Sequence, residues 1–244
     1  MSAPRPTVDE VIGTLQHSCD PTLLAEGIDD IAVLRRFEDE FFDQGLSVLP
    51  LGGRAPVLEI FDRRHELPDT VVVLFLVDQD LWVYTGVPET YSHCRLLFTD
   101  GYSIENDLYR DGNLERLLTA GERRKFRSNL EQFLEWYASN LTRKLDGEEV
   151  ALSVHPRAIL PDNATDEADK LYPPNVNAYE QNFSLISGNY TRLLRGKSLM
   201  ALLVMQLSAP NRVPKHSVRS LMEHGAVAGG VWMNRIREWL ASHL

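Results

Sequence analysis

Apolar runs separated by turn residues and short helical patterns predict an alternation of strands and helices over the first hundred residues. The most apolar run, residues 71–77 (Val-Val-Val-Leu-Phe-Leu-Val), suits a strand that is buried on both faces at the centre of a parallel sheet. Weaker runs predict further strands at residues 22–25, 46–49 and 95–98. Because strands that alternate with helices usually build a parallel sheet, the expected fold class is α/β, with a mostly parallel sheet flanked by helices.

Helices in this half are predicted from caps and from apolar positions three and four residues apart. Thr7 and Glu10 form a capping box, in which the side chain of each residue accepts a hydrogen bond from the backbone N–H of the other. Gly45 suits the end of the second helix, since glycine readily adopts the left-handed conformation there. The expected helices cover about residues 7–17, 29–45 and 55–64.

After about residue 113 the pattern becomes mainly helical. Residues 150–160 suit a strand or an extended segment, and residues 161–174 a polar connection that contains proline. We therefore expect an α/β core over residues 1–112 and a mainly helical part over residues 113–244, which packs on the core or contacts a partner. The helices expected in this second part cover residues 114–145, 178–194, 198–207 and 231–244.

The charge and the cysteines narrow the range of functions. A formal net charge of −10 counts against a protein that binds nucleic acid constitutively. Bound divalent cations, a basic partner or a local basic surface at residues 122–127 or 192–197 would remove that objection. Cys19 and Cys94 are too far apart in sequence for the spacing of a metal site or a redox pair, so we expect neither. We expect a cytoplasmic protein, because no apolar run reaches the roughly 18 residues of a membrane span and no signal-peptide core is present.

Acidic residues follow the predicted strands. Glu26 comes after the first strand, Asp78 and Asp80 after the most apolar strand, and Glu105 after the last. The carboxyl ends of parallel strands meet at one edge of the sheet, and Asp78 and Asp80 would project to the same side if residues 78–80 stay extended. Carboxylates in such an arrangement suit Mg²⁺. The alternative is that Asp-x-Asp forms a turn or a helix cap.

Three segments resemble the TOPRIM superfamily, whose fold is shared by topoisomerases, bacterial primases and OLD-type nucleases. Residues 23–34, which include Glu-Gly at 26–27 and Asp30, resemble the first TOPRIM motif, and residues 73–80 resemble the second. Ser-Ile-Glu-Asn at 103–106 is typical of one OLD-like branch, as is Gly-Lys at 196–197 before an apolar helix. That branch includes the nuclease component of the PARIS antiphage system.

The resemblance implies a TOPRIM (Rossmann-like) catalytic core and an endonuclease that depends on Mg²⁺ or Mn²⁺. It implies tRNA as the substrate and an ABC-type ATPase as the sensor partner. We further hypothesise that this partner holds the chain inactive and that the chain dimerises on release. Glu26, Asp78 and Asp80 would be catalytic metal ligands, with Lys197 facing the scissile phosphate. Asp30 would be an accessory ligand and Glu105 part of a second metal site. The alternatives are a helix cap for Asp30 and a solvated helix start for Lys197, and Asn106 would anchor a loop.

Two alternative functions are a DNA nuclease and a non-catalytic module. The chain contains no Walker A sequence, so ATP use would belong to the partner. An OLD-type nuclease that degrades DNA has the same motifs. A non-catalytic module that binds only the ATPase would need none of the acidic residues.

Overall fold

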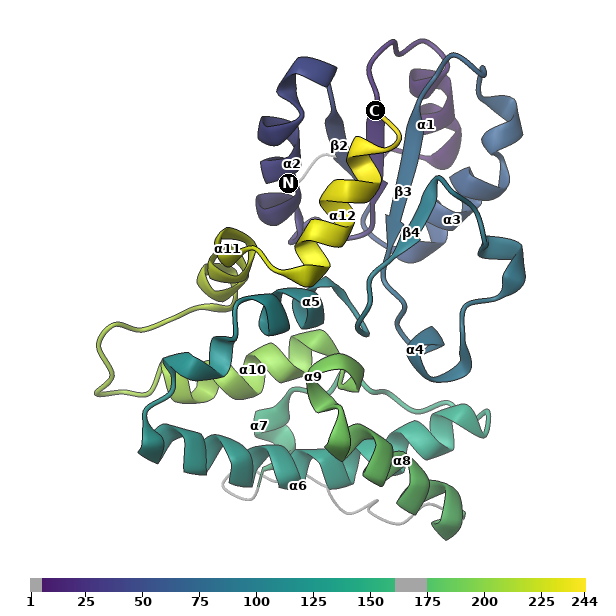
Figure 1. Cartoon of the computed structure of the whole chain (residues 1–244). Helices are drawn as coiled ribbons and strands as arrows, with labels where there is room; N and C mark the ends of the chain where they lie inside the picture. Colours follow the sequence, from purple (N-terminus) through teal and green to yellow (C-terminus); the bar gives the residue numbers. More distant parts are fainter. Residues whose placement is uncertain (1–5, 161–174) are drawn as a thin grey trace.

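The computed structural model describes residues 6–160 and 175–244 and shows an α/β fold, which confirms the expected class (Figure 1). Its four strands are all parallel and lie in the order β2-β1-β3-β4. Each strand falls where the apolar runs predicted it. The strands are β1 (Thr22–Ala25), β2 (Ser47–Pro50), β3 (Val73–Val77) and β4 (Leu96–Phe98).

Helices cover both faces of the sheet. Helices α1 (Val8–Leu15) and α3 (Arg54–Asp62) pack on one face, and α2 (Ile31–Glu40) packs on the other (Figure 1). Strand β3 serves both layers, because Leu74 and Leu76 join the core on the α2 side while its other three side chains join the α1 and α3 side. The predicted burial of this strand on both faces is therefore confirmed.

The local signals that predicted the first helices are present in the structure. Thr7 and Glu10 form the capping box of α1, and Gly45 has φ +74°, the left-handed conformation that ends the turn after α2. Two features differ from the prediction. The end of the second predicted helix is a separate 3-10 turn (Phe42–Gln44). A short helix, α4 (Trp82–Thr85), follows β3.

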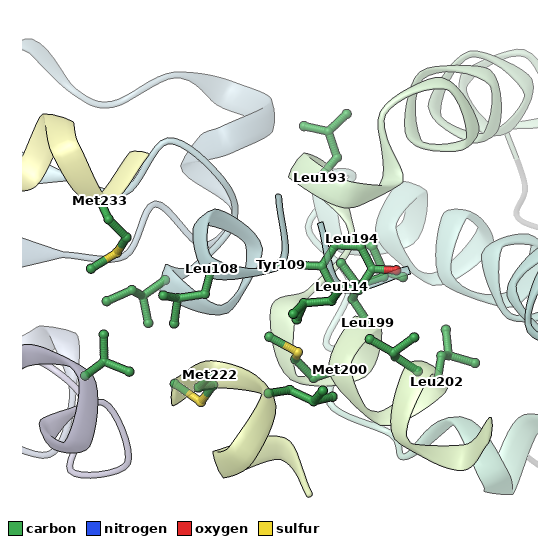
Figure 2. Packing of buried hydrophobic residues seen from close by; sticks show 14 of the residues in the cluster. Leu108, Tyr109, Leu114, Leu193, Leu194, Leu199, Met200, Leu202, Met222 and Met233 are labelled. Carbon is green, nitrogen blue, oxygen red and sulfur yellow. The ribbon is translucent and has the colours of Figure 1, made fainter. Parts of the chain in front are cut away.

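The second half of the chain is helical, and its core joins that of the sheet (Figure 2). Leu108 lies where several helices meet, with Met222 and Met233 nearby (Figure 2). No helix among the residues described has the length and apolarity needed to cross a lipid bilayer. The helices of this half are α6 (Ala120–Leu145), α7 (Pro156–Ile159), α8 (Val176–Gly188), α9 (Tyr190–Leu193), α10 (Gly196–Leu207), α11 (Val218–Ala228) and α12 (Val231–Ala241).

The last helix returns to the sheet. Figure 1 shows α12 lying across the face that also carries α2, although the two are far apart in sequence. The indole Nε1 of Trp239 donates to Cys94 O at 2.7 Å, and the Arg235 side chain donates to Phe98 O. The C-terminal segment thus completes the cover of the sheet.

Three expectations for the chain after β4 are corrected. Residues 104–111 form helix α5 (Ile104–Asp111), which was not predicted; Asn106 lies in its first turn and donates to Thr191 O and Leu194 O in the segment before α10. Residues 150–160 contain no strand; Pro156 instead begins α7, with His155 as its cap. Helix α11 was not predicted, because its buried residues are few and Gly225 interrupts the pattern. The predicted connection at 161–174 lies outside the described residues.

Candidate active site

The two central strands deliver one carboxylate each to the same edge of the sheet. From β1 the chain crosses to β2 on one side and later returns to β3 on the other, so the ends of β1 and β3 flank a topological switch point, where open α/β sheets bind ligands. Glu26 follows β1 and Asp78 follows β3. The backbone N–H of Asp78 donates to Glu26 Oε1 at 2.8 Å. The predicted meeting of these two residues is confirmed.

The amino end of α5 forms the third side of this site. The first backbone N–H of the helix, that of Ile104, donates to Asp78 Oδ1 at 3.0 Å. Ser103 and Asn106 make a capping box, and the Ser103 hydroxyl donates to Glu105 Oε2 at 2.5 Å. Because a helix N-terminus carries partial positive charge, it favours a carboxylate at this position. The Ser-Ile-Glu-Asn segment is therefore a helix start that anchors Asp78 and buries Glu105.

Glu26, Asp78 and Glu105 line a pocket of about 410 Å³, which we call the acid pocket. It contains four of the five predicted metal-binding acids together with Lys197. Gly27 and the glycines at 52 and 53, which follow β2, form part of its wall. The charged residues that line it are Glu26, Asp29, Asp30, Asp78, Glu105 and Lys197.

Asp80 does not line the acid pocket, and the extended conformation considered for residues 78–80 is not found. Strand β3 ends at Val77, and Asp80 has φ +48°, so residues 78–80 are not extended and do not present Asp78 and Asp80 in the alternation of a strand. The Asp80 N–H donates to Tyr102 O at 2.7 Å, which holds this conformation. Its carboxylate lies 3.4 Å from Arg54 Nη1.

Asp30 is at the cap position of α2, yet its side chain makes no cap hydrogen bond. It is 9% exposed and lies against Gly27. A Cβ built at Gly27 would be 1.9 Å from Asp30 Oδ2, so a side chain at position 27 would displace this carboxylate. The Glu-Gly pair of the first motif therefore has two structural roles: it places Glu26, and it makes room for Asp30.

Burial disfavours the ionised form of these acids and so raises their pKa values. It raises the pKa of Glu26 to about 7, against the opposing effect of the hydrogen bond from Asp78. It also raises the pKa of Asp30 to about 7, with a contribution from the charge of Glu105. The pKa of Asp78 lies well above its usual range, because burial is reinforced by the charges of Glu26 and Glu105. At neutral pH this pocket favours protons or another cation.

The cations near the site come from two segments. Lys197 is the second residue of α10 and is exposed; its Nζ lies 3.5 Å from Asp29 Oδ2. Arg54 begins α3, donates to Gln79 O at 3.2 Å and stacks over the Trp82 ring at 4.5 Å. Arg54 was not among the predicted site residues. The Gly-Gly-Arg sequence at 52–54, directly after a predicted strand, was the signal available for it.

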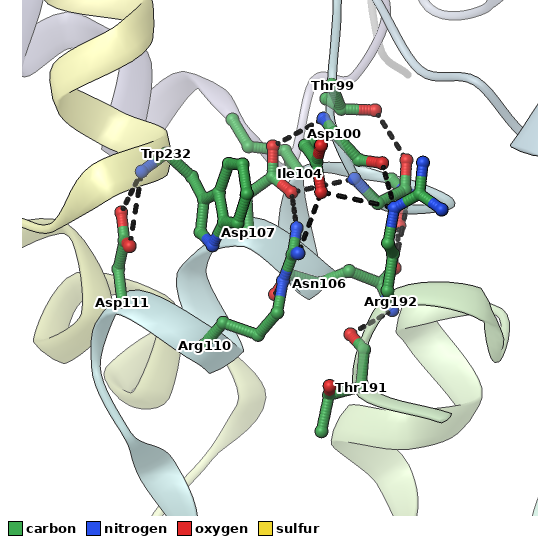
Figure 3. A network of polar contacts seen from close by, with 12 residues as sticks. Thr99, Asp100, Ile104, Asn106, Asp107, Arg110, Asp111, Thr191, Arg192 and Trp232 are labelled. Carbon is green, nitrogen blue, oxygen red and sulfur yellow. Dashed lines mark hydrogen bonds and ion pairs between the residues drawn. The ribbon is translucent and has the colours of Figure 1, made fainter. Parts of the chain in front are cut away.

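A buried ionic network holds α5 behind the site (Figure 3). Asp107 accepts from the backbone N–H groups of Asp100 and Gly101 at 3.0 and 2.8 Å, and Arg110 pairs with both Asp107 and Asp100. Arg192, from the predicted basic region, also pairs with Asp100 at 3.2 Å. Part of that region is therefore engaged in structure.

The residue types of the acid pocket suit a divalent cation, but in this conformation their side chains are not grouped as a metal-binding site. Carboxylate oxygens are the ligands that Mg²⁺ prefers. Within residues 6–160 and 175–244, however, no three His, Cys, Asp or Glu side chains are grouped so that they could hold a metal ion. One oxygen of Glu26 and one of Asp78 bind backbone N–H groups. An ion in the acid pocket would require the side chains of Glu26, Asp30, Asp78 and Glu105 to turn toward it.

Comparison with known proteins adds no family to this description. No family model matches the chain, and the search of curated proteins finds no significant match.

Proposed function

We propose that the chain is a metal-dependent endonuclease that cleaves RNA, with tRNA as its substrate. One observation carries the proposal: Glu26 and Asp78 are in contact at the switch point of a parallel sheet, inside a pocket that also holds Asp30, Glu105 and Lys197. Several carboxylates with raised pKa values and one lysine, in an open pocket, suit a divalent cation and a phosphate. The TOPRIM-like sequence motifs fall on these same residues.

Each residue has a role in this proposal. Glu26 and Asp78 would hold a divalent cation, with Asp30 and Glu105 beside them. Such a cation would supply activation of water and stabilisation of the charge that develops in phosphodiester hydrolysis. The amino end of α5 fixes Asp78, and Gly27 allows the approach of Asp30. Exposed Lys197 is free to reach a phosphate at the mouth of the pocket once it leaves Asp29.

The proposal extends to a defence role. An ABC-type ATPase partner would keep the nuclease silent and release it, to act as a dimer, when a phage is sensed. The net charge of −10 supports this view, since a free acidic protein binds the phosphate backbone poorly. Full cleavage of tRNA by the isolated monomer, with neither partner nor trigger, would contradict this control.

Replacement of Glu26 by Ala tests the central claim. We expect the triggered complex to cleave labelled tRNA in Mg²⁺ and to lose roughly 1000-fold in rate on this substitution, because a catalytic cation contributes several kcal/mol. EDTA should have the same effect on the wild type, and Mn²⁺ should restore cleavage. The matched control is Glu131→Ala, at an exposed position of α6, which should cleave at the wild-type rate.

The same experiment separates two rival functions. Cleavage of plasmid DNA but not of tRNA would indicate an OLD-type DNA nuclease. Toxicity in cells that persists in the Glu26→Ala variant would indicate a non-catalytic module that binds the ATPase. The lack of a preassembled three-residue metal group in the described chain favours this second rival. Calorimetric titration with Mg²⁺ and Mn²⁺ tests it directly, because a module without a metal site should bind neither ion.

A further inference from the structure

A second pocket, of about 480 Å³, adjoins the acid pocket, and we call it the apolar pocket. The two share Ile28, Asp29, Glu105 and Lys197 in their linings. Its volume lies within the range of roughly 300–1000 Å³ that is typical of small-molecule sites. The apolar pocket is therefore placed to receive a group that is covalently attached to whatever lies beside Lys197.

Its walls are apolar and come from three helices. Ala32 belongs to α2, Ala201 to α10 and Met222 to α11. Two of these wall residues are alanines, whose short side chains leave room between the helices. Val218, at the start of α11, is 36% exposed at the pocket. A flat apolar group could enter here and contact side chains on several sides.

The rim of the apolar pocket is polar. His155 and Arg219 line it in addition to the shared residues. The Arg219 side chain is 77% exposed, and its only close anionic partner among the described residues is Glu223, at 3.2 Å. Ring nitrogens and guanidinium N–H groups can bond to the polar edge of a heterocycle, while the apolar walls contact its faces.

We propose that the apolar pocket binds one nucleobase of a single-stranded nucleic acid whose phosphate lies at the acid pocket. The proposal rests on the proposed nuclease function, which places the phosphate beside Lys197. A nucleobase combines two apolar faces with a polar edge, as this pocket does, and it is joined to its phosphate through a single sugar. The strand must be unpaired there, because a base in a duplex is not free to enter a pocket. An apolar side chain from a protein partner could not bond to the charged residues that the two pockets share, Asp29, Glu105 and Lys197.

The test pairs two exposed valines of α11. Val218→Trp fills the apolar pocket, whereas Val227→Trp places the same side chain at a position that is 64% exposed and does not line it. The triggered complex of each variant is given single-stranded RNA 12-mers that carry one abasic site, moved along the strand. In the wild type and in Val227→Trp, one abasic position should lower cleavage about tenfold, as expected for the loss of one stacked base. Val218→Trp should cleave the unmodified strand about tenfold more slowly, and abasic substitution should slow it no further.

Binding distinguishes failure of this proposal from failure of the nuclease function. Fluorescence anisotropy of the same RNAs needs no cleavage. One outcome is that no variant cleaves, while one abasic position weakens binding to the wild type but not to Val218→Trp. This outcome would support the base pocket and contradict the nuclease function. If the wild type cleaves, yet Val218→Trp matches Val227→Trp and no abasic position matters, the base pocket is wrong. A loss of ATPase binding in Val218→Trp with unchanged RNA cleavage would also overturn it.

Discussion

At the residue scale, the site is a group of carboxylates held in conformations that the neighbouring chain imposes. Glu26 and Asp78 each use one oxygen on a backbone N–H, and Asp30 is pressed against Gly27. Burial raises the pKa of all three, so the ionised pocket is destabilising in the absence of a cation. Under the proposed function, a bound cation would remove this repulsion and so stabilise the folded state.

The pH dependence of stability should report this repulsion. The folded pKa of Glu26, about 7, exceeds its ordinary value of 4.5, so the folded state holds the proton more tightly and loses stability as pH rises between these values. Glu26→Gln mimics the neutral form. Without metal, we expect its stability relative to the wild type to rise from pH 4.5 to 7 and then to level off, by on the order of 1–3 kcal/mol.

Urea unfolding at a series of pH values, in EDTA, measures this difference. The control is Glu131→Gln, which changes the same charge at an exposed position of α6 and should give a difference independent of pH. Saturating Mg²⁺ should reduce the advantage of Glu26→Gln at pH 8. An advantage that is equal at pH 4.5 and pH 8 would contradict the proposed ionic origin.

At the element scale, the contact between the starts of α5 and α10 determines where the site residues lie. Gly196, the first residue of α10, has no space for a side chain: a Cβ there would be 2.2 Å from Ser103 Oγ and 2.9 Å from Glu105 Cβ. Asn106 Nδ2 donates to Thr191 O and Leu194 O, both at 2.9 Å. Gly196 thus allows the start of α10 to pack closely against the start of α5, and the next residue, Lys197, lies at the acid pocket.

Substitution of Gly196 by Ala should disturb this contact between α5 and α10. The added methyl group would push against the Ser103 and Asn106 side chains that cap α5, so we expect a loss of about 1–3 kcal/mol in the free energy of unfolding, as for other overpacked sites. Gly188→Ala, at the end of α8, is the matched control, since nothing lies within 4 Å of its added Cβ. It should be neutral or slightly stabilising, because alanine favours helix. Equal stability of the two variants in urea unfolding would argue against the close contact.

At the scale of the whole molecule, α12 ties the end of the chain to the site. The Asp111 carboxylate, at the end of α5, accepts from Met233 N at 2.8 Å and from Trp232 N at 3.1 Å, and so caps the amino end of α12 from another element (Figure 3). Arg110 lies over the Trp232 ring at 4.1 Å. Helix α5 therefore connects Asp78 at one end with the cover of the sheet at the other.

Removal of this cap should loosen α12. We expect Asp111→Ala to lose about 0.5–2 kcal/mol of stability, the usual cost of removing a carboxylate cap, with faster hydrogen exchange concentrated in α12. Asp39→Ala, on the exposed side of α2, is the control and should change neither quantity by more than about 0.5 kcal/mol. Faster exchange spread evenly over the molecule would indicate that α12 is not a separate unit of stability.

The sequence by itself determined the strands, the α/β class and the position of acids at strand ends. These follow from local rules: β-branched runs form buried strands, and parallel strands bring their carboxyl ends to one edge. The contact of Glu26 with Asp78 was predictable in this way. Glu105 was predicted from its position after the last strand and Lys197 from the motif resemblance, and the structure brings both to the same pocket.

Tertiary structure alone decided the rest. Helix α5 starts at a local capping box of Ser103 and Asn106, but its position at the site also depends on Asn106 Nδ2, which donates to carbonyl groups more than 80 residues away. Asp80 does not line the acid pocket, because Tyr102 holds its backbone and Arg54 lies beside its carboxylate, although its charge still acts on Glu26 and Asp78. The apolar pocket exists only where α2, α10 and α11 meet. Contacts between distant segments carry free energies comparable to local preferences, and at these positions the contacts prevail.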